Sequence, residues 1–342
     1  MTKNTPTVKI IVATHKKYEM PQDAMYLPLH VGAEGKTDQN GNPLDLGYQK
    51  DNTGENISNK NAAYCELTGL YWAWKNLDTD YTGLAHYRRH FGKKTKAPFE
   101  GVLTYNELRP MLEKYKIFVP KKRKYYIETL YSHYEHTHYA SQLDITREII
   151  AEKYPDYLKS YDEVVKHTYG YMFNMMIMQK RYLNDYCEWL FDILFELEKR
   201  IDPQELSAFQ GRFYGRVSEI IFNVWLDGEI KLGKIKKNEI KELPYQHMEK
   251  INWWKKGSAF IKAKFAGKRY EGIVPLMAII ALYFSCAYRK IYNNKPFTII
   301  IYAYLFNDLI MLIFSDRFYE TVASIGFVKH LLVTFILYCF NS

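Results

Sequence analysis

VKIIVATHK, residues 8–16, is the stretch that decides the fold. Val8 to Ala13 form a short apolar run rich in β-branched side chains, which is typical of a buried strand in an α/β sheet. Thr14, His15 and Lys16 follow at the carboxyl end of that strand, where open α/β sheets bind their ligands. We therefore expect an α/β fold whose first strand ends at a binding site.

Further apolar runs extend this sheet on both sides. Strands are predicted for YLPLHV (26–31), YTGLA (81–85), IFVP (117–120) and YMFNMMIM (171–178). Apolar side chains at helical spacing predict helices over 61–76, 183–200 and 217–226, and the polar segment 125–167 is also expected to be helical. Segment 34–61, rich in Gly, Asn and Asp, is expected to be a long functional loop.

Basic side chains follow three of the predicted strands. His15 ends the first strand, His86, Arg88 and Arg89 follow YTGLA, and Lys121–Lys124 follow IFVP. Because the carboxyl ends of parallel strands share one edge, these cations are expected to meet in one cleft. Arg binds phosphate oxygens with two parallel hydrogen bonds, so the cleft favours a diphosphate. The alternative is that Arg88 and Arg89 form surface ion pairs.

Asp78-Thr79-Asp80 matches the D-x-D pattern with which many glycosyltransferases hold Mn²⁺ or Mg²⁺. Here it precedes the YTGLA strand, whereas a metal motif should follow one, and His86-Tyr87-Arg88 takes that later position. We therefore expect a turn at Asp78–Asp80 and a metal-independent site without a cofactor. The alternative is a Mn²⁺ or Mg²⁺ site at Asp78 and Asp80.

His133, His136 and His138 lie close together in the sequence. On a helix His133 and His136 share a face and His138 does not, and the H-E-x-x-H motif of helical zinc sites is absent from the sequence. Polar roles, or roles facing the acceptor of a transferred group, are therefore expected for His136 and His138 in place of metal binding.

An inverting sugar transfer needs a carboxylate base for the acceptor hydroxyl. The candidates are Asp144, Glu219 and Asp227, and Glu219 and Asp144 are preferred. Glu219 opens an apolar helix directly after the basic segment 212–216, RFYGR. The alternative is an ordinary acidic residue at a helix start, favoured by the helix dipole.

The composition narrows the function classes. The net charge of +9 attracts phosphates, but helix-turn-helix, zinc-finger and aromatic RNA-binding patterns are absent, which argues against nucleic acid. The sequence also lacks G-x-S-x-G, G-x-x-x-x-G-K-[ST] and G-x-G-x-x-G, which disfavours α/β-hydrolases, P-loop enzymes and common dehydrogenases.

The four cysteines, Cys65, Cys187, Cys286 and Cys339, form no C-x-x-C pair. Residues 1–9 are polar and lack the apolar region of a signal peptide, so the catalytic part is expected in the cytoplasm.

The composition changes near residue 245. Segment 241–271 is basic and contains Trp253 and Trp254, and three apolar stretches follow at 272–288, 296–314 and 322–340. We expect a catalytic domain over 1–245 and a hydrophobic helical extension over 246–342 that binds the membrane, with anionic headgroups meeting the basic segment. The alternative is a buried helical subdomain that packs on the catalytic core.

Several segments together resemble one bacterial family. They include IIVATHKKYEMP (10–21), DNTGENISNKNAAYCELTGLYWAWKN (51–76), DYTGLAHYRRHF (80–91), HTYGYMFNMMIMQKRYLNDYCEWLFDILFELEKRID (167–202) and RFYGRVSEIIFNVWL (212–226). The family is a glycosyltransferase-like domain of unknown function found in capsular and exopolysaccharide gene clusters. The resemblance covers about residues 8–270, and the pair Y-W-A-W-K-N and G-L-x-H-Y-R-R is its most specific part.

The resemblance implies a GT-A-like nucleotide-sugar-binding sheet flanked by helices. It implies a hexosyltransferase that moves a hexose from a UDP-sugar, such as UDP-galactose, UDP-glucose or UDP-galactofuranose, to a glycan or lipid-linked oligosaccharide at the cytoplasmic face of the bacterial inner membrane. The implied acceptor side includes His136, His138 and Arg212. The implied donor-binding residues are Thr14, His15, Gly32, Asp51, Asn56, Asn61, His86, Arg88 and Arg89.

Two other function classes remain open from the sequence. One is a non-catalytic, membrane-associated scaffold of a polysaccharide assembly complex, which has no need for His86, Arg88 and Arg89 at a strand end. The other is a phosphate-transferring enzyme, which would require carboxylates and a metal ion in the cleft.

Overall fold

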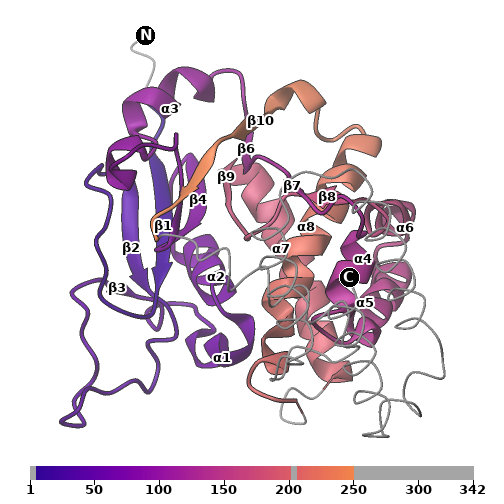
Figure 1. Cartoon of the computed structure of the whole chain (residues 1–342), viewed down its shortest axis with the longest axis horizontal. Coiled ribbons are helices and arrows are strands. Elements are labelled where there is room, and N and C mark those ends of the chain that lie inside the picture. The colour runs from indigo at the N-terminus through magenta and orange to yellow at the C-terminus, as the bar shows by residue number, and fades with distance from the viewer. Residues whose placement is uncertain (1–4, 202–205, 250–342) are drawn as a thin grey trace, which may run out of the picture. The chain divides into compact units, whose positions relative to one another are not determined.

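The computed structural model describes residues 5–201 and 206–249 (Figure 1). Its main sheet has the order β10-β6-β9-β4-β1-β2-β3, and β5 and β11 extend it from the end of β4. β9 runs antiparallel to β4 and β6, whereas the other pairs along this order are parallel. The strands are β1 (Val8–Thr14), β2 (Tyr26–His30), β3 (Gln49–Lys50), β4 (Tyr81–His86), β5 (Arg89–Phe91), β6 (Ile117–Pro120), β9 (Met176–Gln179), β10 (Ile240–Leu243) and β11 (Tyr245–His247).

Helices cover the sheet and form a bundle beside it (Figure 1). They are α1 (Asn61–Tyr64), α2 (Leu67–Asn76), α3 (Tyr105–Leu112), α4 (Leu130–Glu135), α5 (Ala140–Lys153), α6 (Leu158–Val164), α7 (Lys180–Arg200) and α8 (Phe213–Lys231). A separate two-stranded ribbon pairs β7 (Arg123–Lys124) with β8 (Tyr169–Gly170). The fold is therefore the mixed α/β architecture that the sequence predicts.

β1 lies in the middle of the parallel part because both of its faces are apolar. Ile11 and Ala13 pack into the core cluster that contains α2, α7 and α8, whereas Ile10 and Val12 pack into the cluster that contains α3. Successive side chains of a strand point to opposite faces, so this one run joins the two cores.

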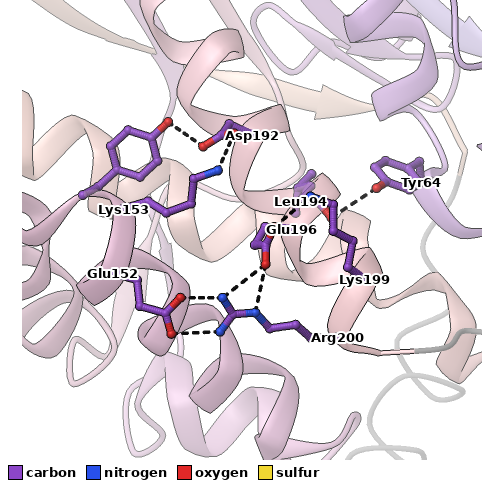
Figure 2. Close-up of polar contacts among 9 residues, drawn as sticks. Tyr64, Glu152, Lys153, Asp192, Leu194, Glu196, Lys199 and Arg200 are labelled. Carbon is purple, nitrogen blue, oxygen red and sulfur yellow. Dashed lines mark hydrogen bonds and ion pairs between the residues drawn. The ribbon is translucent and has the colours of Figure 1, made fainter.

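Polar contacts between helices of the bundle hold α1, α5 and α7 together (Figure 2). Arg200 of α7 makes a two-pronged pair with Glu152 of α5, at 2.5 and 3.1 Å. The Tyr64 hydroxyl at the end of α1 donates to the Leu194 carbonyl of α7, at 3.3 Å. Tyr64 also stacks on Tyr214 of α8, so α1 is held by both long helices.

Two predicted elements differ from the structure. The helix expected over 61–76 is broken, because Cys65 has φ 54° and ψ −130° and separates α1 from α2. The strand expected over 171–178 begins only at Met176, because Phe173 and Asn174 have φ 79° and 52°, which a strand cannot accommodate. Both irregular points lie at the site described below.

β11 crosses the domain boundary expected at residue 245, since it spans Tyr245–His247 and pairs with β5. The hydrophobic extension and its apolar stretches lie outside the described residues, which end at 249. Within residues 5–201 and 206–249, none of the helices has the length and apolar character needed to cross a bilayer.

Candidate functional site

The carboxyl ends of β1, β4 and β6 lie at one edge of the sheet, as the sequence predicts. β1 and β4 are parallel, and β9 is antiparallel to both β4 and β6, so β6 runs in the same direction as β4. The pairing of His86 with Arg89 makes β4 and β5 a tight hairpin with Tyr87 and Arg88 in its turn. The hairpin therefore brings two arginines to this edge.

Arg89 is held in place more firmly than Arg88. The Arg89 guanidinium carbon lies 3.9 Å from the centre of the Phe173 ring, and its Nε donates to Nδ1 of His247 at 3.4 Å. Burial lowers the pKa of Arg89, against the opposing effect of Glu219 and Glu66. Arg88 is exposed and lies 3.9 Å from Glu249.

His86 contributes a neutral ring rather than the positive charge expected from the sequence. Burial, together with Arg89 and Arg88, lowers the pKa of His86 to about 3. His15 lies at the surface, and its partial burial, followed by the charge of Arg88, lowers its pKa as well. At neutral pH both rings can donate one hydrogen bond and accept another.

The start of α8 adds two further arginines, Arg212 and Arg216. Both side chains are solvent-facing, and the Arg212 Nε lies 3.1 Å from Sγ of Cys65. Arg212 also lowers the pKa of His15, so the charge at the start of α8 is felt at the end of β1. Arg212, expected on the acceptor side, thus belongs to the same cationic group as the donor-side residues.

Glu219 lies beneath Arg216, one helical turn further along α8. Its side chain is 8% exposed, and Oε1 lies 3.4 Å from the Arg216 guanidinium. Burial raises the pKa of Glu219, while Arg216, Arg89 and Arg123 oppose that shift. Arg123 of β7, whose guanidinium lies 4.7 Å from the centre of the Tyr125 ring, is one of the groups that oppose the shift. The arginines of the β4–β5 hairpin, of β7 and of the start of α8 are called the arginine cluster below: Arg88, Arg89, Arg123, Arg212 and Arg216.

Sequence reasoning missed Glu66 and Asn174. The Glu66 carboxylate raises the pKa of Arg89, Arg212 and Arg216, and its Oε1 accepts a hydrogen bond from Asn174 at 2.9 Å. Neither residue follows a parallel strand, so the strand-end rule does not find them. Glu66 lies in the ELTGLYW segment (66–72), whose sequence predicts a regular helix, and Asn174 lies in the apolar run 171–178, which predicts a strand.

Asp51, expected to bind the sugar donor, is instead a buried residue that holds the backbone next to the site. It is fully buried, and its carboxylate accepts hydrogen bonds from the backbone N–H groups of Gly32 and Ala33 and from the hydroxyls of Ser58 and Thr68. Every one of these partners is internal, so Asp51 fixes the loop after β2.

Gly32 and Asn61 belong to the same support. Gly32 has φ +66°, and a Cβ atom there would lie 2.5 Å from the Asn61 side chain. Asn61 in turn donates to the Cys65 carbonyl at 2.6 Å and so stabilises the break between α1 and α2. The Thr14 hydroxyl is buried and donates to the Lys16 carbonyl, and Asn56 caps the turn at Gly54 and Ser58.

The histidines after β7 are arranged around one carboxylate. Nδ1 of His133 and Nδ1 of His136 each lie 2.9 Å from an oxygen of Glu128. His138 is buried, contacts Gln210 at 3.0 Å and has a pKa lowered to about 4 by burial, so it is a packing residue rather than an acceptor contact. Within the part of the chain that the structure describes, no group of three or more His, Cys, Asp or Glu side chains is arranged to hold a metal ion.

The other carboxylates from the sequence have local partners. Asp144 is exposed on α5 and accepts from the Tyr131 hydroxyl at 2.9 Å. Asp227 pairs with Lys231 at 2.6 Å. Asp80 accepts from the backbone and hydroxyl of Thr7, and Asp78 pairs with Lys180 at 2.5 Å. Of the predicted bases, the structure brings Glu219 to the arginine cluster.

The arrangement is suited to an anion with several charges. Guanidinium groups of the hairpin and of the start of α8 repel one another, since Arg88 lowers the pKa of Arg89 and Arg216 opposes the raised pKa of Arg212. The two carboxylates at the cluster, Glu66 and Glu219, are fewer than its five arginines. A diphosphate would neutralise that excess and accept charge-assisted hydrogen bonds from several arginines.

Comparisons with known proteins agree with this architecture. A solved structure entitled "WbbM bifunctional glycosytransferase apo structure" is similar at 30% sequence identity and a TM-score of 0.63. The similarity covers 71% of this chain and 46% of that chain, so this chain corresponds to less than half of that protein. No curated protein sequence matches. Residues 9–230 match the family described as "Domain of unknown function (DUF4422)". The match spans more than half of the chain, and the protein therefore belongs to the DUF4422 family.

Proposed function

We propose that this protein is a glycosyltransferase that moves a hexose from a UDP-sugar to a lipid-linked oligosaccharide in capsule or exopolysaccharide synthesis. The observation that carries the proposal is the arginine cluster around Glu219 at the carboxyl edge of the sheet. The similarity to a glycosyltransferase structure supports the reaction class.

In this proposal the arginine cluster binds the donor diphosphate, and His15 and His86 add neutral hydrogen-bonding groups. Stabilising the charge that develops on the leaving diphosphate favours breakage of the sugar–phosphate bond. Glu219 accepts the proton of the acceptor hydroxyl, and the raised pKa caused by its burial makes it a stronger base than an exposed Glu.

A non-catalytic scaffold explains the cluster less well. A scaffold has no use for mutually repelling arginines around a buried carboxylate, since that arrangement costs stability unless an anion binds. Titration with UDP separates the two functions, because a scaffold would not bind it.

We expect transfer to persist in EDTA. Asp78 and Asp80 are already engaged by Lys180 and Thr7, and they precede β4 at the edge opposite the arginine cluster. The measurement is UDP release from a screened panel of UDP-sugars, with and without EDTA. Complete loss in EDTA that Mn²⁺ restores would assign the diphosphate to a metal ion instead.

The membrane part of the proposal is supported by the tip of the loop after β7. Tyr126 and Ile127 are 81% and 73% exposed, and Tyr126 has φ 61°. The exposed cations Lys121, Lys122 and Lys124 precede them. Apolar side chains beside cations suit an anionic lipid surface, which would also carry the lipid-linked acceptor. The proposed location is the cytoplasmic face of the bacterial inner membrane.

We expect the double variant Tyr126→Ser/Ile127→Ser to bind vesicles of phosphatidylcholine and phosphatidylglycerol at least about 10-fold more weakly than the wild type, since burial of a large apolar side chain contributes about 1.5–3 kcal/mol. Co-sedimentation of the full chain measures this. Leu232→Ser is the matched control, because Leu232 is 41% exposed at the end of α8. Equal binding of the double variant and the wild type would remove the loop from the membrane contact.

A further inference from the structure

Glu66 is a second carboxylate at the arginine cluster, and the backbone that presents it is strained. Cys65, directly before it, has φ 54° and ψ −130°, a conformation that an L-residue adopts only when its surroundings impose it. Glu66 stands at the N-cap of α2, yet its side chain does not cap that helix. The break in the helix instead directs the carboxylate toward α8.

Asn174 holds one oxygen of this carboxylate. Its amide nitrogen donates to Oε1 of Glu66 at 2.9 Å and to the Gly215 carbonyl at 3.0 Å, while its amide oxygen accepts from the Ser218 hydroxyl at 2.9 Å. Asn174 is 3% exposed and has φ 52°, so a second unusual backbone position serves the same contact. Two such positions meeting at one side chain indicate a functional requirement.

The other oxygen of Glu66 is available to a ligand. Among residues 5–201 and 206–249, Oε2 of Glu66 has no hydrogen-bond partner, and the side chain is only partly buried. Glu219 differs, because its Oε1 already lies 3.4 Å from the Arg216 guanidinium. An ionised carboxylate repels a phosphate but accepts hydrogen bonds from hydroxyl groups.

We propose that Glu66 binds a hydroxyl of the transferred sugar and helps to set which donor is accepted. This rests on the proposed function, in which Arg89, Arg212 and Arg216 bind the diphosphate. The transferred sugar is bonded directly to that diphosphate. Glu66 follows Cys65, whose Sγ lies 3.1 Å from Nε of Arg212, and its partner Asn174 also contacts Gly215, the residue before Arg216. The free oxygen of Glu66 therefore lies beside the arginines proposed to hold the diphosphate, where the sugar ring would be. Glu66 is then a specificity-determining residue that takes no part in proton transfer.

The test is calorimetric titration of the full-length wild type and Glu66→Gln with UDP, UDP-glucose, UDP-galactose, UDP-N-acetylglucosamine and UDP-glucuronate. We expect UDP to bind the variant as well as the wild type, within about twofold. The preference of the wild type for its best UDP-sugar over the others should fall about 10-fold or more in the variant, since a hydrogen bond to a charged group is lost.

Three further variants make the result specific. Asn174→Ala keeps the Glu66 carboxylate but removes the hydrogen bond that positions it. The preference for the best UDP-sugar should therefore fall by a smaller factor than in Glu66→Gln. Glu219→Gln should keep the preference, and so should Glu188→Gln, whose carboxylate is exposed on α7. Thermal unfolding establishes that each variant is folded, and Glu66→Asp replaces Glu66→Gln if the latter does not fold.

An unchanged preference in Glu66→Gln would overturn this role, and so would equal losses for UDP and UDP-sugars, which would mean that Glu66 only positions the arginines. A wild type that binds neither UDP nor any UDP-sugar would contradict the proposed function itself. The two failures are therefore distinguishable.

Discussion

Replacing Arg89 is expected to weaken UDP binding by about 10- to 100-fold, because hydrogen bonds to charged groups contribute about 1.5–3 kcal/mol. Arg89→Met is the suitable change, since its side chain can still pack on Phe173 while the charge is removed. Arg89 is pre-positioned by Phe173 and His247, so little ordering is required when the diphosphate binds. The measurement is calorimetric titration with UDP.

Arg88→Met is the matched control on the same hairpin. Arg88 is exposed and lies near Glu249, so we expect a smaller loss than for Arg89→Met. Unchanged UDP affinity in folded Arg89→Met, or a larger effect of Arg88→Met, would show that the hairpin does not bind the diphosphate in this way.

Glu219→Gln is expected to lower turnover by about 10²- to 10⁴-fold, the usual contribution of a positioned general base. Donor binding should change little, because the base acts on the acceptor hydroxyl. Gln has nearly the same shape as Glu, so its packing beneath Arg216 is preserved while the proton-accepting carboxylate is lost.

The pH dependence gives a second readout for Glu219. Burial raises the pKa of its carboxyl, and only the ionised form accepts a proton. Turnover should therefore fall as the pH decreases through that raised pKa, at a higher pH than for an exposed Glu, and this acid limb should be absent from the residual activity of Glu219→Gln. Asp144→Asn should be near normal, because Asp144 contacts Tyr131 on the outer bundle. Near-normal turnover in Glu219→Gln would remove the assignment.

The strands and the shared edge could be predicted because β1 and β4 are continuous apolar runs with basic residues at their carboxyl ends. Arg88, Arg89 and Arg123 follow from the rule that ligands bind at the carboxyl ends of parallel strands, whereas the sequence placed Arg212 on the acceptor side. The rule could not show that burial makes His86 neutral, or that Asp51 would use its carboxylate on internal partners. Those outcomes depend on tertiary packing.

The positions of Glu66 and Asn174 could not be predicted, because both depend on left-handed backbone at non-glycine residues. The local sequence around Cys65 favours a continuous helix, and the apolar run at 171–178 favours a strand. In each case contacts distant in the sequence, such as Asn174 with Gly215 and Ser218, impose the irregular conformation. Such conflicts between local preference and fold often occur at functional sites.

The most direct test of the central claim is titration of the full-length protein with UDP in the presence of EDTA, followed by competition with inorganic pyrophosphate. The arginine cluster predicts saturable binding of UDP that pyrophosphate displaces and that Arg89→Met weakens by about 10-fold or more. Absence of UDP binding by the folded wild type, or binding that neither pyrophosphate nor Arg89→Met affects, would contradict the claim.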